Sequence, residues 1–256
     1  MTIRGGDTSR LRRINMVATL RSLRGQGPVG LTDLARRASL SRPTIEGLVE
    51  ELLTAGWLRE LPPETGQMGR PARLITFNAG AGHVLGIDIG SFTVRATVAD
   101  LDGDVLSAHS ERVSATCGRA ERLQVTHRAA EGALKAAGLA KSQVTAVCVG
   151  TTGVVTAEGV VKLSVGLPEW TGIDLAAEFR DGYDCPVLVE NDCNLAALAE
   201  GWIGQAKGTK DLVFVLSGVR TGAGLLFDGR LHRGRRGSAG EIGALPLVGW
   251  HRAPRT

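Results

Sequence analysis

The stretch PVLVENDCNLAALAEGWIG, residues 186–204, joins an apolar segment to a helical one through three polar residues. PVLV has the composition of a buried strand, and it leads into Glu190, Asn191 and Asp192. The segment NLAALAEGWIG that follows is typical of a helix. In α/β folds, ligands bind beyond the carboxyl ends of strands, where such polar side chains collect. The stretch therefore predicts an α/β domain with a candidate ligand site at this strand end.

The segments on the N-terminal side of this stretch fit the same fold class. HVLGIDIGSFTVRATVADLDGDVLSAHSERV, from His83, predicts three strands, with a glycine turn after the first and an Asp102-Gly103 hairpin after the second. A helix is expected from about Arg119 to Ala137, followed by the strand VTAVCVG, the small hairpin VVTAEGVV and the helix GIDLAAEF. Strands and helices that alternate in this way predict an α/β domain.

Three helical segments are expected before the first of these strands. LRRINMVATLRSLRGQG ends at its glycines, LTDLARRASL offers Thr32 as an N-cap, and SRPTIEGLVEELLTAG offers Ser41 as an N-cap with Pro43 in its first turn. Gly56 closes the third helix. The apolar positions at helical spacing are Leu11, Ile14, Val17, Ala18, Leu34, Ala35, Ala38, Ile45, Leu48, Val49 and Leu52. Three short helices with such turns indicate helix-turn-helix geometry.

The next segment adds a wing, because GWLRELPPETGQMGRPARLITFN predicts a strand, a turn containing Gly and Pro, and a second strand. A winged helix can bind DNA or serve as a plain protein–protein module. Residues 1–80 contain 12 Arg, no Lys and 7 acidic residues, so their net charge is +5 while that of the whole chain is +4. Arginine suits phosphate and guanine edges, although the same charge is compatible with a solvated surface.

The exposed side of the third helix supplies the first candidate DNA contacts. Arg42 and Thr44 suit phosphate or base contacts, and Glu46 can accept a hydrogen bond from a cytosine amino group. Glu50 and Glu51 would repel the DNA backbone, so we expect them on a solvated part of the helix.

The wing supplies the second set of candidates. In GRPAR, Arg70 and Arg73 flank Pro71 on a stiff turn that can enter a narrow minor groove, where A·T-rich sequence concentrates negative potential. The alternative is an ordinary surface turn with exposed arginines.

The order of motifs resembles the ROK family of bacterial repressors and sugar kinases. The winged helix is followed by GRPARL, LGIDIG, VENDCNLAALAEGWIG and FVLSGVRTGAGLLFDGRLHRGRRGSAGEIG, so the resemblance covers nearly the entire chain. It implies a winged helix-turn-helix DNA-binding domain over residues 1–80. It also implies a ribonuclease-H-like actin/hexokinase-type ATPase domain over residues 81–256. Because family members with a winged helix are longer, we expect the second lobe of the latter domain to be incomplete.

The resemblance also assigns roles to single residues. Asp88 and Gly90 match the first phosphate motif, and Asp192 matches the base that takes a proton from a sugar hydroxyl. Asn191 and Glu241 match groups that hold sugar hydroxyls. For Asp192 the alternative is a structural role, because an acidic residue at a helix N-terminus interacts favourably with the helix dipole.

Both phosphate loops depart from the kinase pattern. Ser91 and Phe92 stand where family kinases have the Gly and Thr of D-x-G-G-T, which replaces a phosphate-binding hydroxyl with a ring. In the second loop, G-T-G-x-G-G-G, Val219 and Arg220 replace the Thr and the second Gly. A side chain at such a glycine opposes close approach of phosphate to the backbone. The degenerate loop positions are Asp88, Gly90, Gly218, Arg220 and Gly222.

The sugar and zinc positions of the family are also altered. Gly166, in VGLPEW, replaces an Asn of the family, and Ala244 replaces a His that serves both the sugar and a structural zinc. The Cys-rich zinc motif expected downstream does not occur before Thr256, and the four cysteines of the chain form no C-x-x-C pair. We therefore expect no metal, no cofactor and no disulfide framework.

These features predict a DNA-binding transcriptional regulator, a repressor of carbohydrate genes, with a degenerate, non-catalytic kinase-like domain. Its expected partners are a double-stranded DNA operator, a second copy in a homodimer, and a small sugar or sugar derivative bound near Asn191, Asp192 and Glu241. The alternatives are an ATP-dependent sugar kinase, and a truncated product that folds poorly because sheet edges are left uncovered. No apolar run could span a bilayer and charges interrupt the N-terminus, so we expect a cytoplasmic protein without membrane contact.

Overall fold

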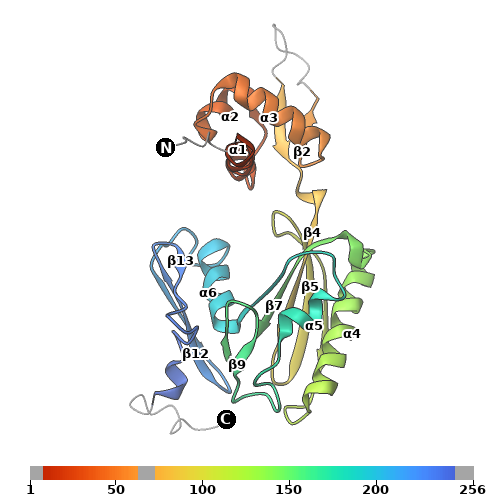
Figure 1. Cartoon of the computed structure of the whole chain (residues 1–256), viewed down its shortest axis with the longest axis vertical. Coiled ribbons are helices and arrows are strands. Elements are labelled where there is room, and N and C mark those ends of the chain that lie inside the picture. The colour runs from red at the N-terminus through yellow and green to blue at the C-terminus, as the bar shows by residue number, and fades with distance from the viewer. Residues whose placement is uncertain (1–7, 63–72, 246–256) are drawn as a thin grey trace, which may run out of the picture. The chain divides into compact units, whose positions relative to one another are not determined.

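A computed structural model describes residues 8–62 and 73–245 of the chain (Figure 1). The chain divides into two compact units. The first comprises Met1–Gly82 with Asp100–Asp104, and the second comprises His83–Ala99 with Val105–Thr256. The domain boundary predicted after residue 80 stays a prediction. Within the described ranges, no helix combines the length and the apolar character needed to cross a bilayer.

The first unit is a three-helix bundle with a small sheet. Its helices are α1 (Thr8–Leu23), α2 (Leu31–Ala38), α3 (Arg42–Thr54) and the short 3₁₀ helix η1 (Ala79–Ala81), and its strands are β1 (Val29–Gly30), β2 (Leu58–Leu61) and β3 (Leu74–Phe77). The strand order is β1-β3-β2, and both pairings are antiparallel. This is the predicted winged helix-turn-helix. The predicted turn of the wing falls largely within residues 63–72, which lie outside the described residues.

Helix α3 begins and ends where its sequence predicts. The Ser41 hydroxyl accepts a hydrogen bond from the backbone N–H of Thr44 at 3.4 Å, and Pro43 occupies the first turn, where its missing N–H costs nothing. Gly56 follows the helix with φ of 78°, a left-handed conformation that glycine adopts without strain. The apolar stripe of Ile45, Leu48, Val49 and Leu52 is buried.

Two details of the other helices differ from the prediction. The residues Leu11, Ile14 and Val17 of α1 are exposed, because the helix buries a second apolar side, formed by Met16, Leu20 and Leu23, against the bundle. Helical spacing identifies a helix but does not decide which of two apolar sides is covered.

The N-cap predicted at Thr32 is also wrong. Helix α2 starts two residues earlier than this cap implies, at Leu31, with Gly30 as its N-cap and no side-chain cap. The Thr32 hydroxyl instead accepts a hydrogen bond from Arg42 Nη1 at 3.2 Å.

The second unit is built on a five-stranded sheet of order β10-β7-β4-β5-β6. Strands β10, β7 and β4 are parallel, and β5 and β6 form the predicted antiparallel hairpin. Because parallel strands end at the same edge, the ends of β4 and β10 lie on either side of the end of β7. The strands are β4 (His83–Ile89), β5 (Thr93–Asp100), β6 (Val105–Arg112), β7 (Val144–Thr151) and β10 (Val187–Asn191).

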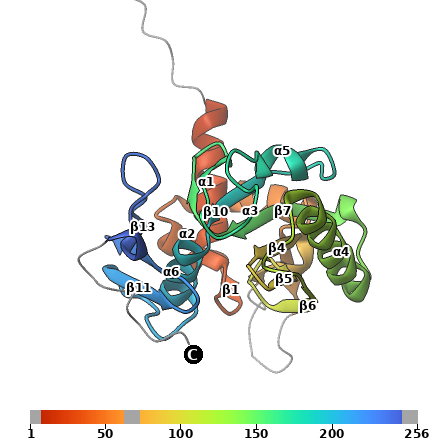
Figure 2. The same cartoon turned by 90° about the horizontal axis from the view of Figure 1, so that it is seen from below.

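Two helices share a core with this sheet. Leu85, Ile87 and Ile89 alternate with less buried residues along β4, and they pack in one cluster with side chains of α4 (Arg119–Ala137) and α5 (Leu175–Arg180). Figure 2 shows α4 alongside β4, β5 and β6. The indole of Trp170 is fully buried in the same cluster.

A second sheet follows the first in the chain. Helix α6 (Asp192–Trp202) starts directly after β10 and packs against β12 (Figure 1). The sheet consists of β11 (Leu212–Ser217), β12 (Thr221–Phe227) and β13 (Arg230–Leu231), all antiparallel. The remaining elements of the unit are the hairpin β8 (Val154–Val155) and β9 (Val161–Leu163) and the 3₁₀ helices η2 (Lys141–Gln143) and η3 (Ile242–Ala244).

A buried arginine holds the turn between β4 and β5. The side chain of Arg122, on α4, is fully buried, and burial lowers the pKa of its guanidinium. Its Nη1 donates to the carbonyl of Gly90 at 2.7 Å, and its Nη2 donates to the carbonyl of Ser114 at 2.9 Å. Through Arg122, α4 therefore fixes the backbone of the first phosphate motif at Gly90.

We predict that Arg122→Met lowers the free energy of unfolding by about 2–4 kcal/mol, because the carbonyls of Gly90 and Ser114 lose the charged donor that the buried guanidinium supplies. Chemical denaturation of the full chain measures this loss. Arg128→Met is the matched control: Arg128 lies on the same helix but is 55% exposed in its side chain and pairs with Glu111 at the surface. Its loss should stay below about 1 kcal/mol. Equal losses for the two variants would contradict the role assigned to Arg122.

Candidate functional site

Three carboxyl groups gather where β10 passes into α6. Asp88 lies near the end of β4, Asp192 is the first residue of α6, and Glu241 immediately precedes η3. Burial raises the pKa of all three carboxyl groups, and repulsion from Asp192 raises the pKa of Asp88 and Glu241 further. Arg95 and Arg220 partly offset the rise at Asp88 and Glu241, respectively. The structure thus brings three of the predicted residues together as hydrogen-bond acceptors for hydroxyl groups.

The pKa of Asp192 bears on the alternative that this residue only stabilises the N-terminus of α6. Its Oδ1 accepts a hydrogen bond from the backbone N–H of Cys193 at 2.9 Å, as expected at the start of a helix. A residue retained only for the helix dipole would have its pKa lowered. Here burial outweighs the hydrogen bonds and the pKa of Asp192 is raised, so its charge costs stability in the ligand-free chain.

Asn191 is engaged by the protein itself. Its Oδ1 accepts a hydrogen bond from the backbone N–H of Asn194 at 3.1 Å, which caps α6, and its Nδ2 donates to the carbonyl of Gly153 at 3.0 Å. The side chain therefore fixes the turn from β10 into α6, and its contact with a sugar hydroxyl stays a prediction.

Glu190 and Arg233 form a contact that the sequence did not indicate. Glu190 is 8% exposed, and its Oε1 accepts hydrogen bonds from the backbone N–H of Asn191 and from Asn194 Nδ2, both at 2.9 Å. Its Oε2 accepts from Arg233 Nε at 2.6 Å. Arg233 follows β13 and precedes Glu241, so this ion pair ties the segment leading to Glu241 to the end of β10.

Glycines of the second phosphate loop allow α6 to approach β12. A Cβ at Gly222 would lie 2.8 Å from Cys193 Sγ, and one at Gly224 would lie 2.2 Å from the Cys193 carbonyl oxygen. Neither glycine has a positive φ among the values found for this chain. The structure thus gives both residues a packing role between β12 and α6, which resemblance to a phosphate loop did not predict.

Arg220 lies against the loop that follows β9. Its Nη2 donates to the carbonyl of Val165 at 2.8 Å. A Cβ added at Gly166 would lie 2.6 Å from Arg220 Nε and 3.1 Å from its Cζ. The guanidinium therefore occupies the space that a side chain at position 166 would need. Two departures from the family pattern, one in the phosphate loop and one in the sugar loop, meet at this point.

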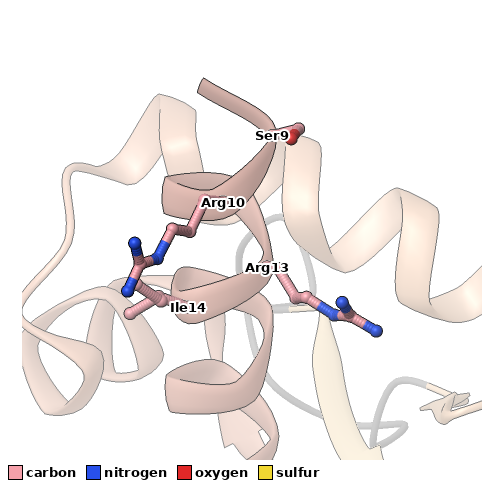
Figure 3. A pocket seen from close by; sticks show the side chains of 4 residues that line it. All are labelled: Ser9, Arg10, Arg13 and Ile14. Carbon is pink, nitrogen blue, oxygen red and sulfur yellow. The ribbon is translucent and has the colours of Figure 1, made fainter. Parts of the chain in front are cut away.

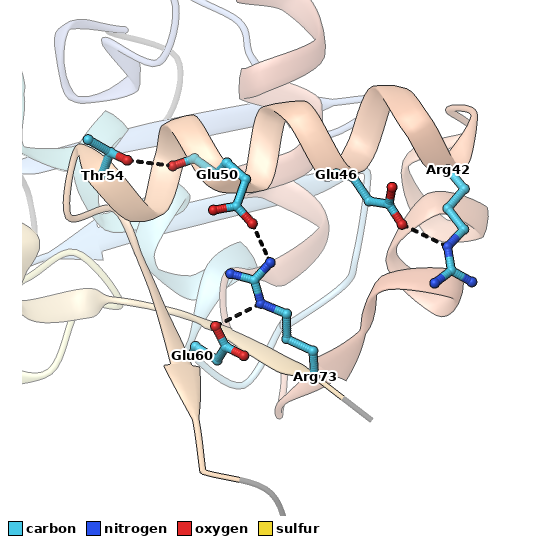
Figure 4. A network of polar contacts seen from close by, with 6 residues as sticks. All are labelled: Arg42, Glu46, Glu50, Thr54, Glu60 and Arg73. Carbon is cyan, nitrogen blue, oxygen red and sulfur yellow. Dashed lines mark hydrogen bonds and ion pairs between the residues drawn. The ribbon is translucent and has the colours of Figure 1, made fainter. Parts of the chain in front are cut away.

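The exposed surface of α3 presents its predicted residues within ion pairs. Arg42 Nε donates to Glu46 Oε1 at 2.9 Å, and Thr44 is exposed beside Arg42 at the start of the helix. Arg73 contacts both Glu50 of α3 and Glu60 of β2 (Figure 4). The remaining predicted wing contacts, at positions 70 and 71, lie outside the described residues.

A hollow on α1 contains none of the predicted residues. It is lined by Ser9, Arg10, Arg13 and Ile14 (Figure 3). The guanidinium groups of Arg10 and Arg13 point in different directions in Figure 3, so they do not converge on one anion. We assign no ligand to this hollow.

We predict that Asp192→Asn raises the melting temperature at neutral pH. The folded-state pKa of Asp192 lies above its unfolded value, so the penalty sets in as pH rises above about 4 and is complete above the folded-state pKa. The advantage of the variant should therefore shrink as pH is lowered toward 4, which thermal melts at several pH values would show. Asp184→Asn, an exposed position, is the control and should show no such trend. A lower melting temperature for Asp192→Asn at neutral pH would mean that the helix dipole dominates.

Comparison with known proteins places this geometry in a family. Residues 84–253 match the model of the ROK family, and residues 17–62 match that of the IclR helix-turn-helix domain. The xylose repressor of Caldicellulosiruptor bescii is 26% identical over 239 residues, which cover 93% of this chain and 60% of the repressor. The chain thus spans about three fifths of the length of this relative.

Two solved structures support the same assignment. A ROK family transcriptional regulator, described as a homologue of the MLC protein of E. coli, matches with a TM-score of 0.75 and 25% identity over 92% of this chain and 59% of that chain. A ROK family glucokinase from Streptomyces griseus, in complex with glucose and AMPPNP, matches with a TM-score of 0.57 and 30% identity over 64% of this chain and 52% of that chain. Since the family model spans more than half of its residues, the chain belongs to the ROK family.

Proposed function

We propose that this protein is a DNA-binding transcriptional repressor whose kinase-like domain binds an effector without phosphorylating it. The observation that carries the proposal is the combination of a winged helix-turn-helix with a ROK domain in which Arg220, at a glycine position of the family's second phosphate loop, donates to the carbonyl of Val165. The similarity to the xylose repressor extends over both parts, whereas the similarity to the glucokinase covers 64% of the chain. Residues 1–80 would bind DNA and residues 81–256 would bind the effector.

The DNA-binding surface would combine α3 with free arginines nearby. Arg42, Thr44 and Glu46 are exposed on the first turns of α3, the position from which a recognition helix contacts bases. Within the described part of the first unit, Arg21 and Arg37 are exposed and make no ion pair, so they remain available to phosphate groups.

The effector would be a small sugar or sugar derivative. Asp192 and Glu241 offer paired carboxylate acceptors to hydroxyl groups, with Asn191 beside them. Binding that favours one of two states of a homodimer would shift the fraction of protein bound to its operator. The name of the xylose repressor relative supports this class of effector.

The alternative of an ATP-dependent sugar kinase is favoured by the gathering of Asp88, Asp192 and Glu241. Phosphoryl transfer, however, requires positioned groups around the phosphates. In this chain Arg220 of the second phosphate loop contacts Val165 in the loop after β9, and Phe92, after the first phosphate motif, is 55% exposed. Asp192 is then a vestigial base, and its carboxylate serves only as a hydrogen-bond acceptor.

We predict salt-dependent binding of the full chain to DNA from upstream of its own coding region. Arg42→Ala should weaken binding by about tenfold and reduce the slope of log affinity against log salt by about one, because one phosphate or base contact is lost. Fluorescence anisotropy titrations at several salt concentrations measure both quantities. Arg180→Ala, an exposed arginine of the second unit, is the control of equal charge change. No binding at low salt would refute the repressor proposal.

The absence of phosphorylation is a separate prediction. ATP consumption in the presence of a panel of hexoses and pentoses should not exceed the protein-free background, for the natural chain and for Asp192→Asn alike. A coupled assay for ADP release measures this. Sugar-dependent turnover that disappears in Asp192→Asn would establish the kinase alternative instead.

A further inference from the structure

We infer that Arg73 holds the wing in position on the recognition helix and that it acts on DNA binding through this link. The inference rests on the proposed DNA-binding function. Arg73 immediately precedes β3, Glu60 lies in β2, and Glu50 lies in α3. Arg73 Nε donates to Glu60 Oε2 at 2.7 Å while its Nη1 donates to Glu50, so one guanidinium joins the wing to α3 (Figure 4).

The position of Arg73 in the sheet makes this link effective. The last residue pair between β2 and β3 is Leu61 with Leu74, and Arg73 stands just beyond it, at the base of the wing. Nearer the other end of the hairpin, Leu58 and Phe77 are buried in the core of the bundle. Ile75 is also fully buried and pairs with Glu60 and with Val29, so the core holds the hairpin up to this pair. The Arg73 contacts add a link at the strand end just beyond it.

The chemistry of the guanidinium suits such a link. Its donors lie in a rigid plane, so two carboxylates bound at once fix the relative position of the elements that carry them. The bond to Arg73 lowers the pKa of Glu50, and both glutamates raise the pKa of Arg73. Their side chains are partly exposed, and the cluster contributes little to overall stability.

A direct DNA contact by Arg73 and a positioning role predict opposite effects of removing a glutamate. Glu50 and Glu60 repel DNA and also hold the guanidinium away from it. If Arg73 contacted phosphate directly, neutralising Glu50 would free the arginine and strengthen binding. If Arg73 positions the wing, the same change weakens binding although it removes a negative charge.

The test compares two neighbouring glutamates of α3 in the full chain. Glu50→Gln breaks the link to the wing, whereas Glu51→Gln removes the same charge but affects only the contact of Glu51 with Arg12 of α1. The probe is a DNA duplex that the wild-type chain selects from a randomised pool. We expect Glu50→Gln to weaken binding by about tenfold, a change of about 1.4 kcal/mol. Glu51→Gln should bind as tightly as the wild type or more tightly.

A salt titration of Arg73→Ala separates the two roles again. We expect a loss of affinity with an unchanged slope of log affinity against log salt, because no phosphate contact is removed. Tighter or unchanged binding by Glu50→Gln, or a slope reduced by about one in Arg73→Ala, would overturn the inference. Thermal melts establish that each variant is folded, and Glu60→Gln, which should weaken binding in the same way, replaces Glu50→Gln if the latter does not fold.

The result for the wild-type chain distinguishes a failure of this inference from a failure of the proposed function. A wild-type chain that selects no duplex at low salt refutes the repressor proposal and, with it, the role of Arg73. If the wild-type chain binds and Glu50→Gln binds as tightly as the wild type, only the role of Arg73 is refuted.

Discussion

The second unit depends on one buried carboxylate, that of Glu190. It receives hydrogen bonds from the backbone N–H of Asn191, from Asn194 and from Arg233, so the end of β10, the first turn of α6 and the segment after β13 meet on one side chain. The Arg233 side chain is 51% exposed, so removing it should cost less than the about 3–5 kcal/mol that is typical of a fully buried ion pair. The positions of Asp192 and Glu241 follow from this contact, since each lies within a segment that Glu190 holds.

Packing at the start of α6 accounts for two glycines of the second phosphate loop, although Arg220 departs from the family pattern in the same loop. Gly222 and Gly224 lie against Cys193 in the first turn of α6, where a side chain would contact Cys193 Sγ or its carbonyl oxygen. This packing requirement does not depend on whether the loop binds phosphate. Glycines in such a motif are therefore weak indicators of nucleotide binding, because the fold requires them for a second reason. Arg220 stands instead in the turn between the paired residues Ser217 and Thr221.

Much of the fold followed from local patterns, whereas the contacts that define the sites did not. Alternating strands and helices, the Asp102-Gly103 hairpin and the cap at Ser41 are set by residues close together in sequence, and the structure contains each of them. An arginine on an amphipathic helix is expected to be solvated. Arg122 is buried instead, and the backbone carbonyls of Gly90 and Ser114 accept hydrogen bonds from its guanidinium. The side of α1 that is buried is likewise decided by packing, not by spacing. Gly90 lies 32 residues before Arg122 and Ser114 lies eight residues before it, and no helical or strand periodicity encodes either contact.

Arg220 and Gly166, two departures from the family pattern that lie far apart in sequence, meet in the structure. By resemblance to the family, Arg220 stands at a glycine position of a phosphate loop and Gly166 at an asparagine position of the sugar loop. In the structure the guanidinium of Arg220 lies over Gly166 and donates to the carbonyl of Val165. A side chain at position 166 and this conformation of Arg220 exclude each other, since a Cβ would approach Arg220 Nε to 2.6 Å. The arginine also places a positive charge near Glu241, whose pKa it lowers against the effect of burial. Changing Arg220 to glycine alone would therefore reopen the loop, leave position 166 without its polar group, and remove a cation that tempers the repulsion between Glu241 and Asp192.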